Sequence, residues 1–319
     1  MTTDEISRVP SAGAQSTKQT VQNLEDVGRE GNTGLNVAHM SPEQRVKVEK
    51  KLVRKLDARC SLFIAIYIMN YLDRNNIASA RLKGLQTDLH LDNAQYSTCL
   101  SILYVGYILM QIPSNMFINR ISRPSLYLGG VMLIWGLIST LTGIVQDFKG
   151  MVLVRFFLGF VEAAFLPGTL LILSKWYTRR ELTMRNALLF CGNLISNAFS
   201  ALVGAGVLSN MQGTLGHAAW RWLFWIEGGV TMLLAITAAL VLPDLPHNTR
   251  GFTEEERQIA QLRMIEDVGE ADTDSKEQGA SAGLIMAMKD FKVWLMMFTL
   301  TAYVVGLSFN AFFVSYPRS

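Results

Sequence analysis

Arg155 and Glu162 are ionisable residues inside a long apolar stretch of the sequence, 155–177. About 20 apolar helical residues cross the ~30 Å hydrocarbon core of a bilayer, and a charge inside such a span is costly unless it faces water or an opposite charge. The two residues are seven positions apart, so a helix presents them on nearly one face, with Gly159 between them leaving room for a neighbouring helix or a ligand. A guanidinium can hold a carboxylate and a carboxyl group can exchange a proton, so the pattern indicates a buried anion site beside a titratable acid. An internal structural ion pair is the alternative.

The composition is typical of a membrane protein. Half of the residues are apolar, 17% are charged and the mean hydropathy is positive. The sequence predicts seven spans, near 60–79, 96–118, 125–145, 150–174, 186–208, 220–242 and 292–314. The first is weak, because its apolar part runs directly into Asp73, Arg74, Asn75 and Asn76. Residues 1–40 are polar and lack the apolar core of a secretory signal peptide.

The distribution of basic residues predicts the orientation. Lysine and arginine are frequent before the first span, between spans two and three and after span four, and are scarcer in the alternate loops. Because basic loops stay on the cytoplasmic side, we expect a cytoplasmic amino terminus, which argues against a G-protein-coupled receptor. The net charge of +3 reflects these scattered loops, so no nucleic-acid partner is expected.

Two polar segments flank the predicted bundle. We expect a disordered cytoplasmic tail over 1–42, an amphipathic lead-in helix over 43–58, a six-helix bundle over 59–243, a cytoplasmic connector over 244–291 and a seventh transmembrane helix over 292–319. The lead-in helix could lie on anionic lipid or be plainly solvated. Within the connector, Thr253 and Glu256 have the spacing of a capping box that would start a helix.

The sequence gives no support for enzyme chemistry. Cys60, Cys99 and Cys191 fall in different predicted spans without a paired spacing, and the four histidines form no ligand cluster. There is no glycine-rich phosphate loop, nucleophile elbow or acidic metal pair. We therefore expect no catalytic residue, no metal and no cofactor.

Several blocks of the sequence resemble one transporter family. These blocks are YLDRNNIASARLKGLQTDLHLDNAQYS (71–97), YVGYILMQIPSNMF (104–117), RFFLGFVEAAFLPGTLLILSKWYTRRE (155–181), WRWLFWIEGG (220–229) and LPDLPHNTRGFTEEERQIAQLR (242–263). They resemble the major facilitator superfamily, and within it the anion:cation symporter family and its fungal allantoate and nicotinate permease branch. The usual Gly-x-x-x-Asp-Arg-x-Gly-Arg loop reads NMFINRISR here, which keeps Arg120 and Arg123 but lacks the acidic residue. An Asp-based cytoplasmic latch is therefore not expected.

The resemblance implies an all-α membrane protein with the facilitator fold: a six-helix N-terminal bundle plus the first helix of the second half. Such transporters have twelve helices with the substrate between the two halves. The chain stops one helix into the second half, so we expect a truncated chain that needs a missing C-terminal half or a second copy for activity.

The resemblance also implies the site residues. Asp73 and Glu162 would exchange protons, whereas Arg74 and Arg155 would attract a substrate carboxylate. Weaker candidates, for which ordinary helix packing is the alternative, are Tyr71, Tyr107 and Asn193. Arg221 is expected to anchor the outer end of its helix, with tryptophans on either side.

The implied function is transport of a small organic anion such as allantoate, ureidosuccinate, nicotinate or pantothenate by proton symport across a fungal plasma membrane. The expected partners are that anion, protons and the lipid bilayer. A truncated, non-transporting sensor and a facilitated uniporter are the alternatives. Proton dependence of uptake separates the uniporter from the symporter.

Overall fold

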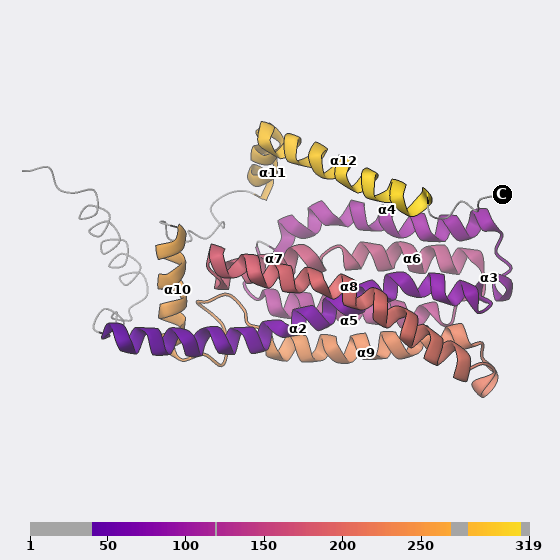
Figure 1. The fold of residues 1–319 in the computed structure, drawn as a ribbon, viewed down its shortest axis with the longest axis horizontal. Helices are drawn as coiled ribbons and strands as arrows, with labels where there is room; N and C mark the ends of the chain where they lie inside the picture. The colour runs from indigo at the N-terminus through magenta and orange to yellow at the C-terminus, as the bar shows by residue number, and fades with distance from the viewer. Residues whose placement is uncertain (1–39, 119, 269–279, 314–319) are drawn as a thin grey trace, which may run out of the picture. The chain divides into compact units, whose positions relative to one another are not determined.

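The computed structural model describes residues 40–118, 120–268 and 280–313, and every regular element in these ranges is a helix (Figure 1). The chain divides into two compact units, Met1–Asp272 and Thr273–Ser319. The first contains the helical bundle and the connector helix. The expected disordered tail lies outside the described residues except for its last positions.

The longest helix of the bundle is α2 (Pro42–Leu82), with 41 residues. It begins at a capping box formed by Ser41 and Gln44 and runs without interruption to Leu82, so at 1.5 Å per residue it is about 60 Å long. The expected lead-in helix and the expected first span are thus one helix. In the lead-in, Leu52 and Leu56 are fully buried, in the same apolar cluster as Ile259 of the connector. Protein therefore covers the apolar side of this segment, which neither sequence-based alternative included.

Five stretches of the described chain are long and apolar enough to cross a membrane. They are α4 (Asn93–Ile118), α5 (Pro124–Thr142), the pair α6 (Phe148–Glu162) and α7 (Phe165–Trp176), α8 (Arg179–Asn210) and α9 (Ala219–Val241). The span expected at 60–79 does not qualify by composition, because polar residues interrupt it. It is nevertheless the inner part of α2, where Asn70, Asp73 and Asn76 are buried by neighbouring helices.

The span expected at 150–174 is broken directly after Glu162, where α6 ends. Proline has no backbone N–H, so Pro167 cannot bond to the carbonyl four residues earlier, at Ala163, and its ring crowds that carbonyl. A short turn replaces the helix there, with the Ala164 N–H donating to the carbonyl of Val161. The break places Glu162 at a helix end in the middle of the bundle.

Glycines bring two pairs of helices into close contact. A Cβ on Gly159 of α6 would lie 2.0 Å from the carbonyl oxygen of Leu103 in α4, and a Cβ on Gly106 would lie 2.2 Å from that of Phe156. In α9, a Cβ on Gly228 would lie 2.2 Å from Oγ1 of Thr140 in α5. Small residues allow this approach in membrane proteins. The space beside Gly159 is therefore filled by a helix and not by a ligand.

The connector helix α10 (Glu254–Val268) packs against α2 at one end of the bundle, which we call the connector end (Figure 1). Thr253 and Glu256 exchange the two hydrogen bonds of a capping box, 3.0 and 3.3 Å long, so this prediction is confirmed. Glu256 also accepts a 2.8 Å bond from Lys55, and Arg263 pairs with Glu49 at 2.8 Å. These bonds fix α10 to the lead-in part of α2.

The remaining described elements are short or lie in the second unit. Helix α3 (Leu85–Asp88) and the 3-10 turn η2 (Thr214–Gly216) belong to loops at the far end of the bundle, opposite the connector end. In the second unit, α11 (Ala280–Lys289) is followed by α12 (Phe291–Phe313), the helix expected as the seventh span. Phe291–Gly306 of α12 is apolar but shorter than the other candidate spans.

Candidate functional site

Glu162 is the centre of a polar site in the middle of the bundle. Its Oε1 accepts a 2.5 Å bond from Nε of Arg74 and a 2.6 Å bond from Nδ2 of Asn70. Both donors come from α2, four residues apart, so they lie on one face of that helix. Only 2% of the Glu162 side chain is exposed, whereas 21% of the Arg74 side chain is exposed. The ion pair therefore has a buried anion and a guanidinium that reaches toward the bundle surface.

Two tyrosines flank the Arg74 guanidinium. Its Cζ lies 4.9 Å from the ring centre of Tyr107 and 5.5 Å from that of Tyr71, within the range of cation–π attraction. A cavity of about 30 Å³ adjoins this group, close to the share of liquid volume that one water occupies. Its lining residues are Tyr67, Asn70, Tyr71, Arg74, Tyr107, Glu162, Phe165 and Leu166. A cavity of this volume is too small for an organic anion, so substrate binding would require the site to open.

Asp73 turns away from this cavity toward α5. Its Oδ2 accepts a 2.6 Å bond from the indole N–H of Trp135, and its Oδ1 accepts a 2.6 Å bond from the hydroxyl of Ser139. The side chain is 3% exposed. Adjacent residues on a helix point about 100° apart, which is why Asp73 and Arg74 reach different partners.

Arg155 is buried among α4, α6 and α9, with 1% exposure. Its Nε and Nη2 have no hydrogen-bond partner among the described residues, and its Cζ lies 5.6 Å from the ring centre of Phe224. The carboxylate that acts on it most strongly is that of Asp73. A buried guanidinium without a direct partner is costly, so its charge must be balanced by nearby acids.

The charged residues are paired differently in the fold than the sequence suggested. The sequence placed Asp73 beside Arg74 and Arg155 on the face of Glu162, whereas the structure joins Arg74 to Glu162 across two helices. No direct Arg155–Glu162 bond, the structural alternative, is found among the described residues. Arg74 and Asn70 bond to Glu162 instead.

The weaker candidates separate into two groups. Tyr71 and Tyr107 lie at the cavity. Asn193 lies on α8, where its Oδ1 accepts a 3.2 Å bond from Asn197, which in turn accepts a 2.9 Å bond from Asn75 of α2. Asn193 is not among the residues that line the cavity, and its hydrogen bond is made within α8, to Asn197, which makes the bond to α2.

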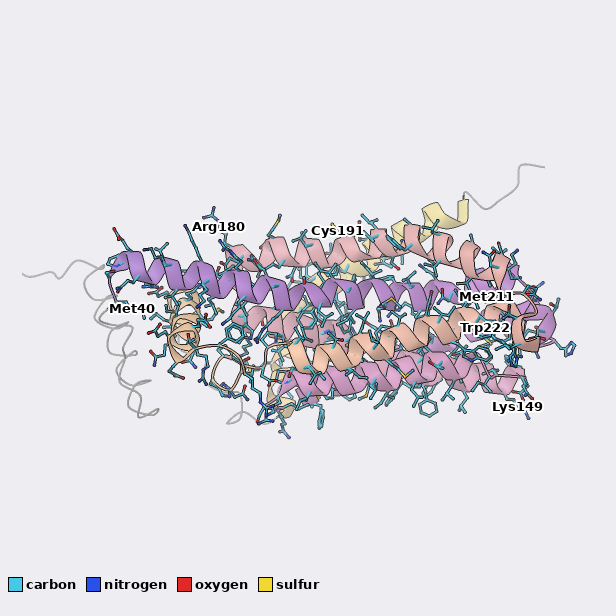
Figure 2. All side chains as sticks on the ribbon, turned by 90° about the horizontal axis from the view of Figure 1, so that it is seen from below. Met40, Lys149, Arg180, Cys191, Met211 and Trp222 are labelled. Atoms are coloured by element: carbon cyan, nitrogen blue, oxygen red, sulfur yellow. The ribbon has the colours of Figure 1, made fainter. Side chains whose placement is uncertain are left out.

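Arg221 is held at the far end of the bundle. It pairs with Asp88 at 3.0 Å and donates to the carbonyl oxygens of Gly143 and Val145 at 2.9 and 2.8 Å. Figure 2 places the neighbouring Trp222 at this same end, with Arg180 toward the connector end. These bonds join the start of α9 to two loops, which is an anchoring arrangement.

Sequence reasoning missed four polar residues of the interior: Asn70, Trp135, Ser139 and Glu227. The first three are ordinary residues of apolar spans and carry no signal of their partners. Glu227 did carry a signal, because it is an acid within the apolar run of α9.

Comparisons with known proteins agree with this architecture. Residues 63–318 match the model of the Major Facilitator Superfamily. The chain is 37% identical over 222 residues to the MFS-type transporter cnsO of Penicillium expansum and 31% identical over 221 residues to the pantothenate transporter liz1 of Schizosaccharomyces pombe, covering 67% and 68% of this chain. It covers 42% and 43% of those proteins, so it spans somewhat less than half of their length.

A solved structure shows the same fold. A bacterial homolog of the human lysosomal transporter Spinster, in an inward-facing and unoccupied conformation, matches with a TM-score of 0.54 at 19% identity, over 63% of this chain and 47% of that chain. The chain belongs to the major facilitator superfamily, whose members are membrane transporters and not enzymes.

Proposed function

We propose that this chain is the substrate-binding N-terminal part of a proton-coupled symporter for a small organic anion. The observation that carries the proposal is the Arg74–Glu162 ion pair beside a small polar cavity. An intramembrane pair of this kind is a default candidate for a substrate and proton pathway. The anion class agrees with the relative from Schizosaccharomyces pombe that is named a pantothenate transporter, since pantothenate is a carboxylate.

The mechanism is an exchange of anions at Arg74. A planar guanidinium binds a carboxylate through two parallel N–H groups, and Glu162 engages Arg74 through Nε alone. A substrate carboxylate that approaches between Tyr71 and Tyr107 can therefore take over the guanidinium. Glu162 would then lose its positive partner in a dry site and take up a proton. Anion and proton would enter together, which is symport.

The proposal extends to the assembly and the membrane. Residues 59–243 would be the N-terminal half of the transporter, 244–291 its cytoplasmic connector and 292–319 the start of the second half. The second half would close the far side of the cavity as the two halves rock. Within the superfamily, we place the chain in the anion:cation symporter family, near the fungal allantoate and nicotinate permeases, at the plasma membrane with a cytoplasmic amino terminus.

Uptake of radiolabelled pantothenate tests this function. The transporter is expressed from its own gene in yeast that lacks its endogenous pantothenate uptake, and uptake is followed over external pH with nicotinate, allantoate and an uncharged amide as competitors. We expect uptake to rise at acidic pH, to collapse with a protonophore and to be inhibited by carboxylates only. Uptake that ignores pH and protonophore would indicate a uniporter, and absence of inhibition by every carboxylate would overturn the substrate class.

A further inference from the structure

Glu227 is a buried acid that the proposed mechanism does not use. It lies in α9, its side chain is 3% exposed, and neither carboxyl oxygen has a hydrogen-bond partner among the described residues. The other two acids of the interior differ from it. Glu162 accepts bonds from Arg74 and Asn70, and Asp73 accepts bonds from two donors of α5.

Packing places Glu227 near Asp73 of α2. Helix α2 packs against α9, and Gly228, the residue after Glu227, lies against Gly136 and Thr140 of α5, next to the two donors that hold Asp73. Helix α9 packs tightly on α5, because Gly228 leaves no room for a Cβ next to Thr140. From α5, the indole of Trp135 and the hydroxyl of Ser139 are both directed at Asp73 and not at Glu227. From α8, the charged residues lie in the first turns at the connector end, where Figure 2 places Arg180. Glu227 follows by five residues on α9 the labelled Trp222, which Figure 2 places at the far end.

On α2, Arg74 bonds to Glu162, and the other guanidinium of this site is on α6. Its Arg155 packs against Phe224, which precedes Glu227 by three residues on α9, but the carboxylate that acts most strongly on Arg155 is that of Asp73. Glu227 therefore has a carboxylate as a neighbour and no guanidinium or ammonium group bonded to it in the described part of the chain. Such a carboxyl is most stable when it carries a proton.

The charges of the interior lead to the same result. Three acids, Asp73, Glu162 and Glu227, face two bases, Arg74 and Arg155. With all five ionised the group has a charge of −1, and one bound proton makes it neutral, which a dry interior favours. An ionised carboxylate only accepts hydrogen bonds, as Asp73 and Glu162 do, so the proton belongs on Glu227.

We propose that Glu227 is a further proton-carrying residue of the transport site and that it shares one proton with Asp73. In the closed interior the proton is on Glu227. When the α5 donors leave Asp73 as the bundle moves, the proton passes from the Glu227 carboxyl to the Asp73 carboxylate, so the number of protons and the total charge are unchanged. This inference rests on the proposed function in one respect: the shared proton is one of the protons that are exchanged during transport.

Infrared difference spectroscopy of the purified transporter in lipid nanodiscs tests the protonation directly, without substrate. A protonated carboxyl has a carbonyl stretch distinct from that of a carboxylate. We expect this band at neutral pH, a shift of the band when the glutamate side chains carry the heavy carbon isotope, loss of the band in Glu227→Gln and its retention in Glu162→Gln. Glu255→Gln, on the exposed side of α10, is the matched control.

The possible results decide whether Glu227 carries the proton. No protonated-carboxyl band at neutral pH, a band insensitive to glutamate labelling, or a band that persists in folded Glu227→Gln would each overturn the role of Glu227. If Glu227→Gln does not fold, the labelled unmutated protein and Glu162→Gln decide: a labelled band lost in Glu162→Gln assigns the proton to Glu162 and overturns the proposal. Because no substrate is present, failure of carboxylate uptake leaves this result unaffected.

Discussion

Arg74 and Glu162 are 88 positions apart in the chain, and they form a 2.5 Å ion pair across α2 and α6. Glu162 is the last residue of α6, and both Glu162 and Arg74 line the small cavity beside the pair. A buried pair of this kind contributes little net stability, since desolvation opposes the attraction. Under the proposed function, exchange of Glu162 for a charged ligand accounts for the presence of this pair in an apolar bundle.

The first prediction concerns the geometry of anion binding. Arg74→Lys keeps the charge but removes the planar fork, so we expect the KM for the transported anion to rise by about tenfold, equivalent to ~1.4 kcal/mol. The measurement is concentration-dependent uptake, with surface expression determined in parallel. Asn193→Ala is the matched control, because its contacts are with Asn197 and not with the cavity. An unchanged KM in Arg74→Lys would place Arg74 in structure alone.

The second prediction concerns coupling. Glu162→Gln has the shape of the protonated acid and can still accept a bond from Asn70, so the bundle should fold. We expect loss of proton-driven accumulation while exchange of internal for external anion continues, because exchange does not require the empty carrier to return. Counterflow and accumulation are measured in the same vesicles. Accumulation against a gradient with an unaltered pH profile would contradict the role of Glu162.

The third prediction concerns the packing of α4 on α6. In Gly159→Ala the new methyl group would lie 2.0 Å from a backbone carbonyl of Leu103, so the helices must separate. Overpacking of this type costs about 1–3 kcal/mol, which should lower the melting temperature of the purified protein by several degrees. Gly206→Ala, where a Cβ meets nothing within 4 Å, is the control and should leave the melting temperature unchanged or raised. Equal melting temperatures for both variants would refute close packing at Gly159.

The sequence predicted the fold class, the apolar spans of α4, α5, α8 and α9 and the capping box of Thr253 and Glu256, because these depend on local composition and spacing. It did not predict that α2 is continuous through the lead-in. That continuity requires Leu52 and Leu56 to be covered by α10, and burial by a segment about 200 residues away in the chain leaves no local signal.

The sequence predicted that four ionisable residues lie in the interior of the bundle, but not which partners they bind. Asp73, Arg74, Arg155 and Glu162 are all in the interior, since an ionisable residue in an apolar helix has few other places to go. Their partners depend on the relative rotation and height of α2, α5 and α6. Those quantities are set by close contacts such as the one at Gly159, which appear only once the helices are packed.

The fourth prediction concerns the hold of the connector helix on α2. Burial of the Glu256 carboxyl acts to raise its pKa, but the hydrogen bonds from Lys55 and from the Thr253 N–H, with the charges of Lys55 and Lys51, outweigh it and lower the pKa. A lowered folded-state pKa means that the stabilisation is complete above the unfolded value of about 4.3 and is lost as the pH falls through the folded value. We therefore expect α10 to be docked at neutral pH and to loosen below about pH 4.

Hydrogen exchange of the amides in 254–268 measures this docking. Glu256→Gln should exchange faster at neutral pH than the unmutated protein and should lose part of the acid dependence, because the amide keeps the shape but not the charge that Lys55 requires. Glu255→Gln, whose side chain is exposed on the same turn, should leave both properties unchanged. If the two variants exchange alike, the Lys55–Glu256 pair does not hold α10, and the apolar contact of Ile259 with Leu52 and Leu56 is sufficient to keep the connector in place.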